Sequence, residues 1–487
     1  MTMLVIDVGS SSVRALLFDD EARLLPEATA RRDHHFDSTA QGQSTADPAS
    51  LRRAVEDCID RILRHPQAKE IEAAGMATFV GNLLGLDEHG EPVTPLYTYA
   101  DTRASAAAAA LSAEHDAHAA RQRTGCRIHS AYHPAKLRWL AQAEPAATAQ
   151  VRHWVDFATY CYRVWFGRLV PCSFSVAAWS GLLNREALTW DETWLRALKL
   201  AADQLPPLAD YDDAQAGLCD RYARRWPALR DVPFYLALGD GAAANIGSGG
   251  ASPDRPVLTL GTTAALRVVQ THFQPVPPGL WAYRVDRARH LIGGATSEGG
   301  SIYQWALAAL RLDAEAAEAE LRTRPAGAHG LVVLPLLAGE RSPGYCDFAT
   351  GTLHGLRLST TPIDILQALL EGVALRLRLI DDLLGKPGEF VLAGGGALEK
   401  GEAWAQMLAD ALGRPLRLIA EREPTAKGIA LLIRRGRGAP VAEYEPAIAR
   451  MVEPRPDHQA WVDRQLEAQQ RLYRQFYGQG PAGRISD

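Results

Sequence analysis

The chain has 487 residues, of which 47% are hydrophobic and 22% are charged, and its formal net charge is −5. This balance is typical of a globular protein of about two to four domains, and it excludes disordered, collagen-like and disulfide-scaffold classes. The slightly acidic charge argues against a protein whose main task is to coat nucleic acid.

The N-terminal segment predicts a β-hairpin. Residues 4–9 and 13–18 are short apolar runs rich in β-branched side chains, and a glycine and serines form the turn between them. A helix is predicted over residues 48–63, where apolar side chains recur on one face, and a strand followed by a turn is predicted over residues 73–90. The alternation of strands and helices indicates α/β layers.

An internal repetition follows about half a chain length later. Residues 257–263 repeat the pattern of residues 5–11, which is an apolar strand, a glycine and then hydroxyl residues. Each segment is followed by a second apolar strand. The repetition predicts two similar domains that offer glycine-hydroxyl turns to a shared cleft. Residues 247–256 combine Gly, Ser, Pro and Asp and suit the junction.

The C-terminal part contains a third glycine turn. Gly394, Gly395 and Gly396 follow a strand and precede an amphipathic helix. Upstream, a long helix is predicted to begin at Thr361-Pro362 and to end near Gly385, because Thr suits an N-cap, Pro a first turn and Gly a C-terminus. The tail is predicted to be polar and helical as far as residue 477 and to pack on the second domain.

No apolar run in the sequence approaches the ~18–20 residues of a membrane-spanning helix, and the N-terminal stretch does not have the pattern of a signal peptide. The six cysteines are far apart and include no C-x-x-C pair, as expected for reduced structural thiols. We therefore expect a cytoplasmic protein with a small-molecule partner and with neither a membrane nor a nucleic-acid partner.

The first hairpin could carry chemistry. A carboxylate such as Asp7 at the end of a buried strand is costly unless it is paired. The serines of the following turn offer N–H and O–H donors to phosphate oxygens, and Arg14 could add a bidentate phosphate contact. A plain hairpin with Asp7 facing solvent is an equally open alternative, and no P-loop motif is present.

Asp240 is the candidate general base. It follows an apolar strand within Gly239-Asp240-Gly241, and its small neighbours would let a ligand approach the backbone closely. A carboxylate there could accept a proton from a substrate hydroxyl. Helix capping is the competing interpretation, because Asp is a favoured N-cap residue.

Four further segments have both a functional and a structural interpretation. The turn at residues 394–396 could lie against a flat ring or be only a flexible turn. The segment at residues 299–304 could line the same pocket or simply start a helix. Residues 99–103 could contact a ligand or form a surface ion pair, and the loop at residues 339–343 could be functional or plain.

Taken in chain order, these segments resemble the FGGY family of carbohydrate kinases, within the actin-like ATPase superfamily, over nearly the whole length. The matching segments are residues 7–14 (first phosphate motif), 99–103 (the W-x-D-x-R segment), 124–140 (T-G…K-x-x-W), 239–243 (catalytic aspartate), 261–263 (second phosphate motif), 300–305 (G-x-x-x-Q-W) and 393–397 (adenosine motif). Their common order makes the resemblance specific.

The resemblance implies an α/β fold of two actin-like (ribonuclease H-like) domains with a nucleotide cleft between them. It implies a sugar-binding domain over residues 1–247, a nucleotide-binding domain over residues 248–440 and a helical tail over residues 441–487. A homodimer is common in the family, so it is the oligomer to expect.

The resemblance also implies ATP-dependent phosphorylation of a small sugar, sugar acid or polyol, with Mg²⁺ as cofactor. Asp240 would take the proton of the attacking hydroxyl, and Asp7 and Asp240 would hold the metal ion. ATP would contact Gly9, Ser10, Ser11, Ser12, Arg14, Gly261, Thr262, Thr263, Gly300, Gln304, Gly395 and Gly396. The sugar would contact Val80, Gly81, Tyr99, Tyr132, Asp240 and Gly241.

Gluconate or a related sugar acid is the first choice of substrate, because residues 124–129, 339–343 and 351–356 look most like gluconate kinases. Xylulose, ribulose and glycerol stay open, because Val80-Gly81 stands where many members carry Met-His or Arg-Glu, and Tyr99 replaces the usual Trp. Alternatives of other classes are an actin-like, ATP-switched binding protein without sugar turnover and an autonomous ATPase.

Overall fold

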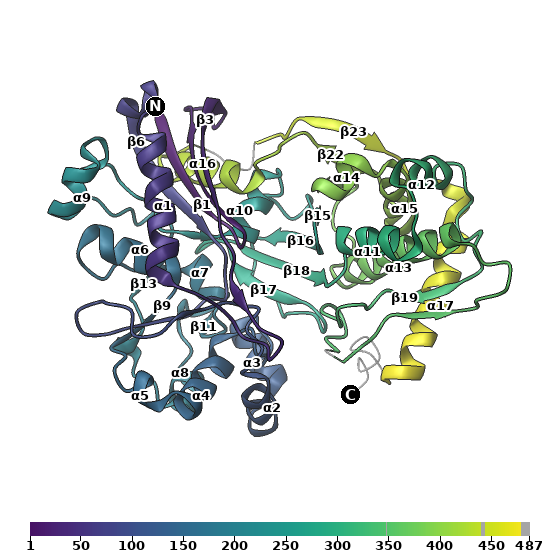
Figure 1. The fold of residues 1–487 in the computed structure, drawn as a ribbon, viewed down its shortest axis with the longest axis horizontal. Helices are drawn as coiled ribbons and strands as arrows, with labels where there is room; N and C mark the ends of the chain where they lie inside the picture. Colours follow the sequence, from purple (N-terminus) through teal and green to yellow (C-terminus); the bar gives the residue numbers. More distant parts are fainter. Residues whose placement is uncertain (347, 440–443, 479–487) are drawn as a thin grey trace.

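Two β-sheets organise the chain, one in each half of the molecule (Figure 1). The computed structural model describes residues 1–346, 348–439 and 444–478. The first sheet contains, in spatial order, β14 (Leu238–Gly239), β6 (Ile71–Thr78), β1 (Thr2–Val8), β2 (Ser12–Phe18) and β3 (Leu24–Asp33). The second contains β17 (Trp281–Arg284), β18 (His290–Thr296), β16 (Ala264–Gln270), β15 (Val257–Leu260), β21 (Val391–Gly394), β22 (Leu416–Ile419) and β23 (Ile448–Val452).

The two sheets repeat one topology. β1, β2 and β3 form an antiparallel meander, and β6 and β14 add in parallel on the other side of β1. In the second sheet, β15, β16 and β18 form the same meander, and β21 and β22 add in parallel beside β15. The repetition predicted from the two glycine-hydroxyl hairpins is therefore confirmed.

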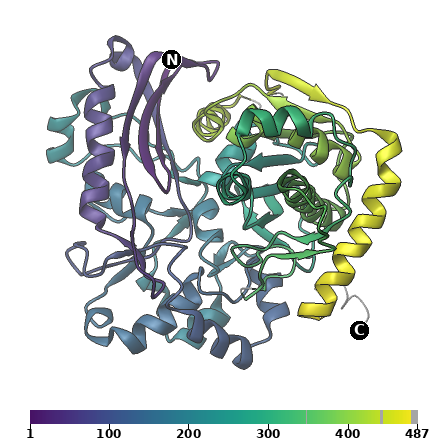
Figure 2. The ribbon, with the colours of Figure 1, turned by 45° about the vertical axis from the view of Figure 1, so that its right-hand side comes forward.

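Helices cover both sheets and fill the space beside them (Figures 1 and 2). The first half contains α1 (Pro48–Ile62), α2 (Ser105–Glu114), α3 (Ala117–Thr124), α4 (His133–Ala143), α5 (Pro145–Thr148), α6 (Phe157–Phe166), α7 (Phe174–Ala178), α8 (Glu192–Leu198), α9 (Asp220–Arg225) and α10 (Asp240–Gly247). The second half contains α11 (Gly300–Leu310), α12 (Ala314–Leu321), α13 (Pro362–Leu383), α14 (Gly396–Lys400), α15 (Glu402–Leu412), α16 (Pro424–Gly436) and α17 (Gln459–Tyr477).

Short paired strands complete the fold. They are β4 (Asp37–Ser38), β5 (Ser44–Ala46), β7 (Leu84–Leu86), β8 (Leu96–Tyr97), β9 (His153–Val155), β10 (Cys172–Ser173), β11 (Leu183–Asn184), β12 (Thr189–Trp190), β13 (Leu208–Ala209), β19 (Val332–Leu334) and β20 (Thr352–His354). Within the described residues, no helix is long and apolar enough to cross a membrane.

The predicted helix starts have a clear local cause. Thr361 caps α13 by accepting the N–H of Asp364, and the Asp364 carboxylate accepts the N–H of Thr361 in return. Pro362 occupies the first helical position, where no backbone N–H is needed. Gly385 lies just beyond the end of α13 with a φ of 78°, as the predicted helix end requires. Both predicted ends of this helix are confirmed.

One helix of the second half belongs to the core of the first. α16 packs on α10 and on β1 and β6, and its apolar residues from 426 to 433 join the first hydrophobic core. Gly428 meets the backbone of Ala243, and Gly247 meets the backbone of Pro424, so the two helices cross closely where side chains are absent. A domain boundary at residues 247/248 would therefore place α16 in the second domain by sequence, although α16 packs in the core of the first.

The tail differs from the expected helix. β23 adds to the outer edge of the second sheet as an antiparallel partner of β22, and only then does α17 begin. α17 lies along β19 and α13 (Figure 2), so packing on the second half is found as predicted. A wholly helical tail is wrong because Ile448–Val452 complete the β22 edge. The expected boundary at residues 440/441 lies outside the described residues.

Candidate active site

The first hairpin places Asp7 and Arg14 opposite each other on β1 and β2. Arg14 forms ion pairs with both Asp7 and Glu423, the residue just before α16. Burial raises the pKa of Asp7, and the charge of Arg14 partly opposes this rise. Asp7 is 2% exposed, so it does not face solvent as a plain hairpin would place it. Arg14 is neutralised by two carboxylates in this state.

The turn after Asp7 presents its hydroxyls outward. Gly9 donates its N–H to the carbonyl of Ser12 at 2.9 Å and accepts a hydrogen bond at 2.9 Å from the ring of His34, which fixes the turn. Ser10 and Ser11 are exposed. Free N–H and O–H donors on a tight turn suit phosphate oxygens.

Three glycine segments of the second half meet at one place. Gly300 begins α11 and donates its N–H to the carbonyl of Gly261 at 2.6 Å, while Ser301 bonds the carbonyl of Thr262. Gly395, with a φ of 114°, lies so close to the backbone of Leu260 that no Cβ would fit.

The side-chain groups of this cluster remain open to a ligand. Thr262 and Thr263 are exposed, and nothing lies within 4 Å of the position a Cβ would take on Gly396. Gln304 is exposed on the second turn of α11. The structure therefore brings the turns at residues 261, 300 and 395 together, whereas contact between Gln304 and a nucleotide stays a prediction.

Asp240 is the first residue of α10, and Gly239 occupies the N-cap position. Its Oδ1 accepts the N–H of Gly241 at 2.7 Å. The interpretation of Asp240 as the N-cap residue is therefore wrong, because the N-cap lies one residue earlier, at Gly239. Burial raises the pKa of Asp240 to about 6, and the nearby charge of Asp7 adds to this rise. The hydrogen bond from the Gly241 N–H and the charge of Arg267 oppose it. Asp240 is thus a carboxylate poised near neutral pH beside a second carboxylate and an arginine.

Val80 and Gly81, which were predicted to contact the sugar, lie beside Gly239 and Tyr99. A Cβ on Gly239 would come within 2.9 Å of both Val80 Cγ1 and the indole Nε1 of Trp179. Gly81, with a φ of 69°, lies against the Cβ of Tyr99. The Nε1 of Trp179 is buried and has no hydrogen-bond partner. This orphaned donor beside Gly239 is a free hydrogen-bonding group next to Asp240.

Aromatic side chains form a wall beside this donor. Trp179 stacks on Tyr283 with ring centroids 3.6 Å apart, and Trp281 also stacks on Tyr283, with ring centroids 4.5 Å apart. The Tyr283 hydroxyl lies 2.6 Å from that of Tyr132. Burial raises the pKa of both tyrosines well above the usual range, so both hydroxyls stay neutral. The wall joins β17 of the second sheet to the first half.

Three arginines surround the same region. Burial lowers the pKa of Arg267 to about 10. The charge of Asp240 opposes this fall and the charge of Arg341 adds to it, so both groups interact electrostatically with Arg267. Arg341 also interacts electrostatically with Tyr132, and the guanidinium of Arg127 lies 4.3 Å from the centre of the Tyr345 ring. The ion pairs found among the described residues involve none of Arg127, Arg267 and Arg341.

The loop that carries Arg341 is fixed from behind. Glu340 is buried, forms an ion pair with Arg376 of α13 and accepts a hydrogen bond from the hydroxyl of Tyr473 of α17 at 2.5 Å. It also accepts the N–H of Gly344 at 3.0 Å. A buried carboxylate with several partners is a rigid anchor. The C-terminal helix thereby helps to set the position of the loop.

Residues 99–103 are held mainly by structural contacts. Asp101 is 2% exposed and forms an ion pair with Arg103, whose guanidinium lies over the ring of Trp139 at 4.6 Å. Lys136 donates to the carbonyl oxygen of Asp101 at 3.2 Å. The surface ion pair considered for this segment is therefore a buried one. Tyr99 is 47% exposed and stays available to a ligand.

Sequence analysis did not single out Trp179, Tyr283, Arg127 or Arg267. Arg267 carried a usable signal, because it is a lone charged residue within the apolar strand β16, as Arg14 is within β2. The aromatic residues carried none, since tryptophan and tyrosine are usual in cores. Only the approach of α7 to β17 gives them a place at the site.

Comparison with known proteins gives a consistent result. The family model described as the N-terminal domain of the FGGY family of carbohydrate kinases matches residues 2–247, and the corresponding C-terminal domain matches residues 257–434. The gluconokinase of Bacillus subtilis is 25% identical over 429 residues, covering 84% of this chain and 82% of that protein. The xylulose kinase of Escherichia coli is 26% identical over 423 residues, covering 84% and 85%.

A solved structure is also similar. The gluconate kinase of Lactobacillus acidophilus superposes with a TM-score of 0.91 at 24% identity, covering 99% of both chains. This likeness concerns the fold, and it confirms the two-domain arrangement implied by the resemblance.

Proposed function

This chain belongs to the FGGY family of carbohydrate kinases and is therefore a phosphotransferase; from that premise we propose that it transfers the γ-phosphate of ATP to a hydroxyl of a sugar acid, with gluconate as the first choice. The observation that supports the choice of an acid is a group of arginines beside Asp240 and the aromatic wall that form no ion pair within the described residues.

The nucleotide is assigned to the glycine turns of both halves. We assign its phosphates to the turn at residues 9–12 and to the turn at residues 261–263, where Ser10, Ser11, Thr262 and Thr263 are exposed. The adenosine is assigned to the surface of Gly300, Gln304, Gly395 and Gly396, where the open space beside Gly396 would admit a flat ring. Positioning and charge neutralisation supply most of the rate in phosphoryl transfer.

The donor set suits Mg²⁺. Asp7 and Asp240 are close enough for the charge of Asp7 to raise the pKa of Asp240. Mg²⁺ is usually held by one or two carboxylates together with substrate phosphates. No group of three potential ligands gathers anywhere in the described part of the chain. We assign the ion to Asp7 and Asp240, where it would neutralise charge on the transferred phosphate.

Asp240 performs the proton transfer. Its carboxylate accepts the proton of the substrate hydroxyl as that oxygen bonds to the γ-phosphorus, and the bond from the γ-phosphorus to the β,γ-bridging oxygen of ATP breaks. The products are ADP and the phosphorylated sugar acid, and the proton leaves Asp240 for solvent. A pKa of about 6 leaves Asp240 ionised at pH 7 while it remains a useful base.

The sugar is assigned to the region between Asp240 and the aromatic wall. The orphaned Nε1 of Trp179 would donate to a substrate hydroxyl beside Asp240. Val80 offers no hydrogen bond there, so recognition falls to the opposite side of the site. Within the described part of the chain, no ion pair engages Arg341 or Arg127, which lie beside Tyr132 and Tyr345. Guanidinium groups bind carboxylates through paired hydrogen bonds. A neutral polyol would leave both charges unused.

The test compares gluconate with glucitol, its neutral analogue, in the double variant Arg127→Gln/Arg341→Gln. We expect kcat/KM for gluconate to fall at least tenfold and kcat/KM for glucitol to change little, because only gluconate carries the carboxylate. Arg168→Gln is the matched control, since Arg168 is exposed and lies near the ring of Phe166 at 5.8 Å. An equal loss for both compounds would contradict carboxylate recognition by these residues.

A further inference from the structure

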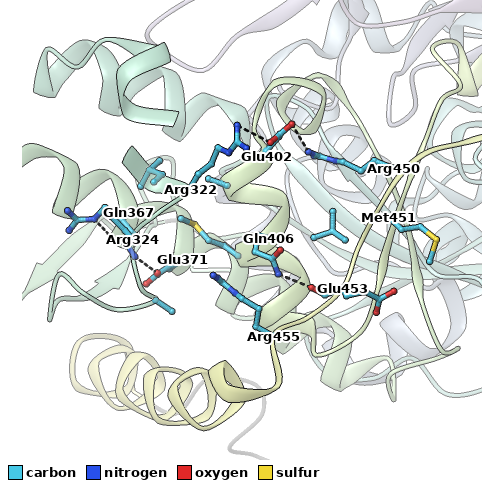
Figure 3. Close-up of a pocket in the computed structure, with 15 residues that line it drawn as sticks. Arg322, Arg324, Gln367, Glu371, Glu402, Gln406, Arg450, Met451, Glu453 and Arg455 are labelled. Carbon is cyan, nitrogen blue, oxygen red and sulfur yellow. Dashed lines mark hydrogen bonds and ion pairs between the residues drawn. The ribbon is translucent and has the colours of Figure 1, made fainter. Parts of the chain in front are cut away.

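A cavity of about 410 Å³ opens in the second half, between α12, α15 and β23. α15 forms its floor, the end of α12 and the following loop form one wall, and β23 forms the other (Figure 3). None of the residues assigned to the nucleotide or to the sugar lines it. Its size falls within the range of small-molecule sites.

Positive charge gathers at the mouth of this cavity. Arg322 from the end of α12 and Arg450 from β23 both pair with the carboxylate of Glu402, at 3.3 and 3.2 Å (Figure 3). Each arginine forms one ion pair with this carboxylate. A guanidinium has five N–H donors, so further donors are available to a ligand. The three side chains are 59%, 32% and 51% exposed, so the pairs are weak and open to exchange.

Two other polar groups of the cavity, Arg455 and Gln406, are already oriented by hydrogen bonds. Arg455 is fixed by Asp410 at 2.6 and 3.0 Å. Gln406 donates to Asp410 and to the carbonyl of Glu453 at 2.8 Å, and the carboxylate of Glu453 points away from Gln406 (Figure 3). A preorganised guanidinium and amide lower the cost of binding a polar ligand.

Glu371 and Glu402 also line the cavity, but they do not cancel the positive charge at its mouth. Glu371 lies 2.8 Å from His329 and accepts a hydrogen bond from Gln367, so both of its oxygens already have partners. Glu402 alone faces the two arginines at the mouth. The start of α15 does not supply the attraction either, because the N–H of Ala403 is already bound to Glu318 at 2.8 Å. Arg324 and Arg455 are already paired with Asp364 and Asp410. The excess of positive charge is therefore confined to the mouth, where Arg322 and Arg450 share the one carboxylate of Glu402.

We propose that this cavity is a second ligand site, which binds a small anion that carries a phosphate group and several hydroxyls, of the size of a sugar phosphate. Arg322 and Arg450 hold the phosphate by exchanging Glu402 for its oxygens, since guanidinium–phosphate pairs are strong and directional. Arg455 and Gln406 bond the hydroxyls. Inorganic phosphate shares the anionic part of this chemistry and lacks the hydroxyls.

The test is calorimetric titration of the whole protein with glucose 6-phosphate, in saturating ADP and gluconate to fill the catalytic site. We expect saturable binding at one molecule per chain, weaker binding of inorganic phosphate and weaker still of glucose. The double variant Arg322→Gln/Arg450→Gln should bind glucose 6-phosphate at least tenfold more weakly. Arg196→Gln is the matched control and should bind normally, since Arg196 is 73% exposed and pairs with Glu192 at 3.5 Å.

A third variant makes a prediction of opposite sign. Glu402→Gln removes the carboxylate that competes for both arginines, so it should bind glucose 6-phosphate more tightly than the unmodified chain. This arm does not depend on whether the double variant folds. Absence of saturable binding, or equal affinity in all four proteins, would overturn the proposal. Equal affinity for inorganic phosphate and glucose 6-phosphate would overturn the part assigned to Arg455 and Gln406.

Discussion

Replacing Asp240 by Asn tests the proposed proton transfer directly. Asn keeps the shape of the side chain and can still accept the N–H of Gly241, so α10 should begin as before. It cannot accept a proton from a hydroxyl. Removal of a general base costs about 10²–10⁴-fold in rate. We therefore expect kcat to fall by at least 100-fold while ADP still binds.

The pKa of Asp240 adds a second signature. Burial raises this pKa to about 6, so about nine tenths of the carboxylate is ionised at pH 7, and roughly one tenth at pH 5. Because the ionised form is the base, kcat/KM of the unmodified enzyme should fall below pH 6 by about tenfold for each further pH unit. The Asp240→Asn variant should lack this fall.

The assay is ADP release, coupled to a dehydrogenase, with calorimetric ADP binding in parallel. Asp220→Asn is the matched control, because Asp220 is also the first residue of a helix, α9, and is exposed. It should retain full activity. More than a tenth of normal turnover in Asp240→Asn, with the acid limb intact, would refute the role of this carboxylate.

Three further predictions concern the supports of the site. Gly428→Ala should lower the free energy of unfolding by about 1–3 kcal/mol in chemical denaturation, because a Cβ would clash with the backbone of α10. Gly372→Ala is the control and should cost nothing, because a Cβ there would make only ordinary contacts. Equal effects of the two substitutions would contradict the close crossing. Burial raises the pKa of Glu298 to about 7, so the folded protein binds a proton there that the unfolded chain releases at lower pH. The free energy of unfolding that this proton contributes, on the order of 3 kcal/mol, is lost as the pH rises through 7. Glu298→Gln should remove that dependence, and parallel stability curves from pH 5 to 8 would count against it. Tyr473→Phe should raise KM for the sugar acid several-fold and leave KM for ATP unchanged, because its hydroxyl anchors Glu340 at 2.5 Å; a rise in both would indicate a general loss of structure.

Local patterns predicted the parts of the fold that are decided locally. The two hairpins follow from apolar runs on either side of glycine and hydroxyl residues, and α13 follows from Thr361 and Pro362. The order of motifs along the chain then identified the family. Each of these signals lies within a few neighbouring residues, where turn and capping preferences act.

Contacts between distant segments could not be predicted in this way. Glu423 pairs with Arg14 only because α16 returns to the first sheet. Trp179 and Tyr283 stack because α7 and β17 meet, although about 100 residues separate them. β23 joins the sheet edge by pairing with β22, and no periodicity of its short segment distinguishes it from a loop.

The substrate assignment depends on the same kind of contact. Arg267 lies beside Asp240 because the second hairpin packs against the first half, and Arg341 reaches this region because Glu340 holds its loop. Neither position follows from local sequence. The chemistry of phosphoryl transfer could thus be predicted from motifs, whereas the proposed preference for an acid rests on the assembled charges.

The most direct measurement is coupled ADP release with Mg-ATP and a panel of gluconate, glucitol, xylulose, ribulose and glycerol. We predict that gluconate, or another sugar acid added to the panel, raises turnover by orders of magnitude above the rate without acceptor, and that the neutral compounds lag well behind. A neutral sugar or polyol that surpasses every acid would contradict the proposed role of the arginines. Turnover that no acceptor raises, in a protein that binds ATP, would contradict the proposed acceptor chemistry altogether.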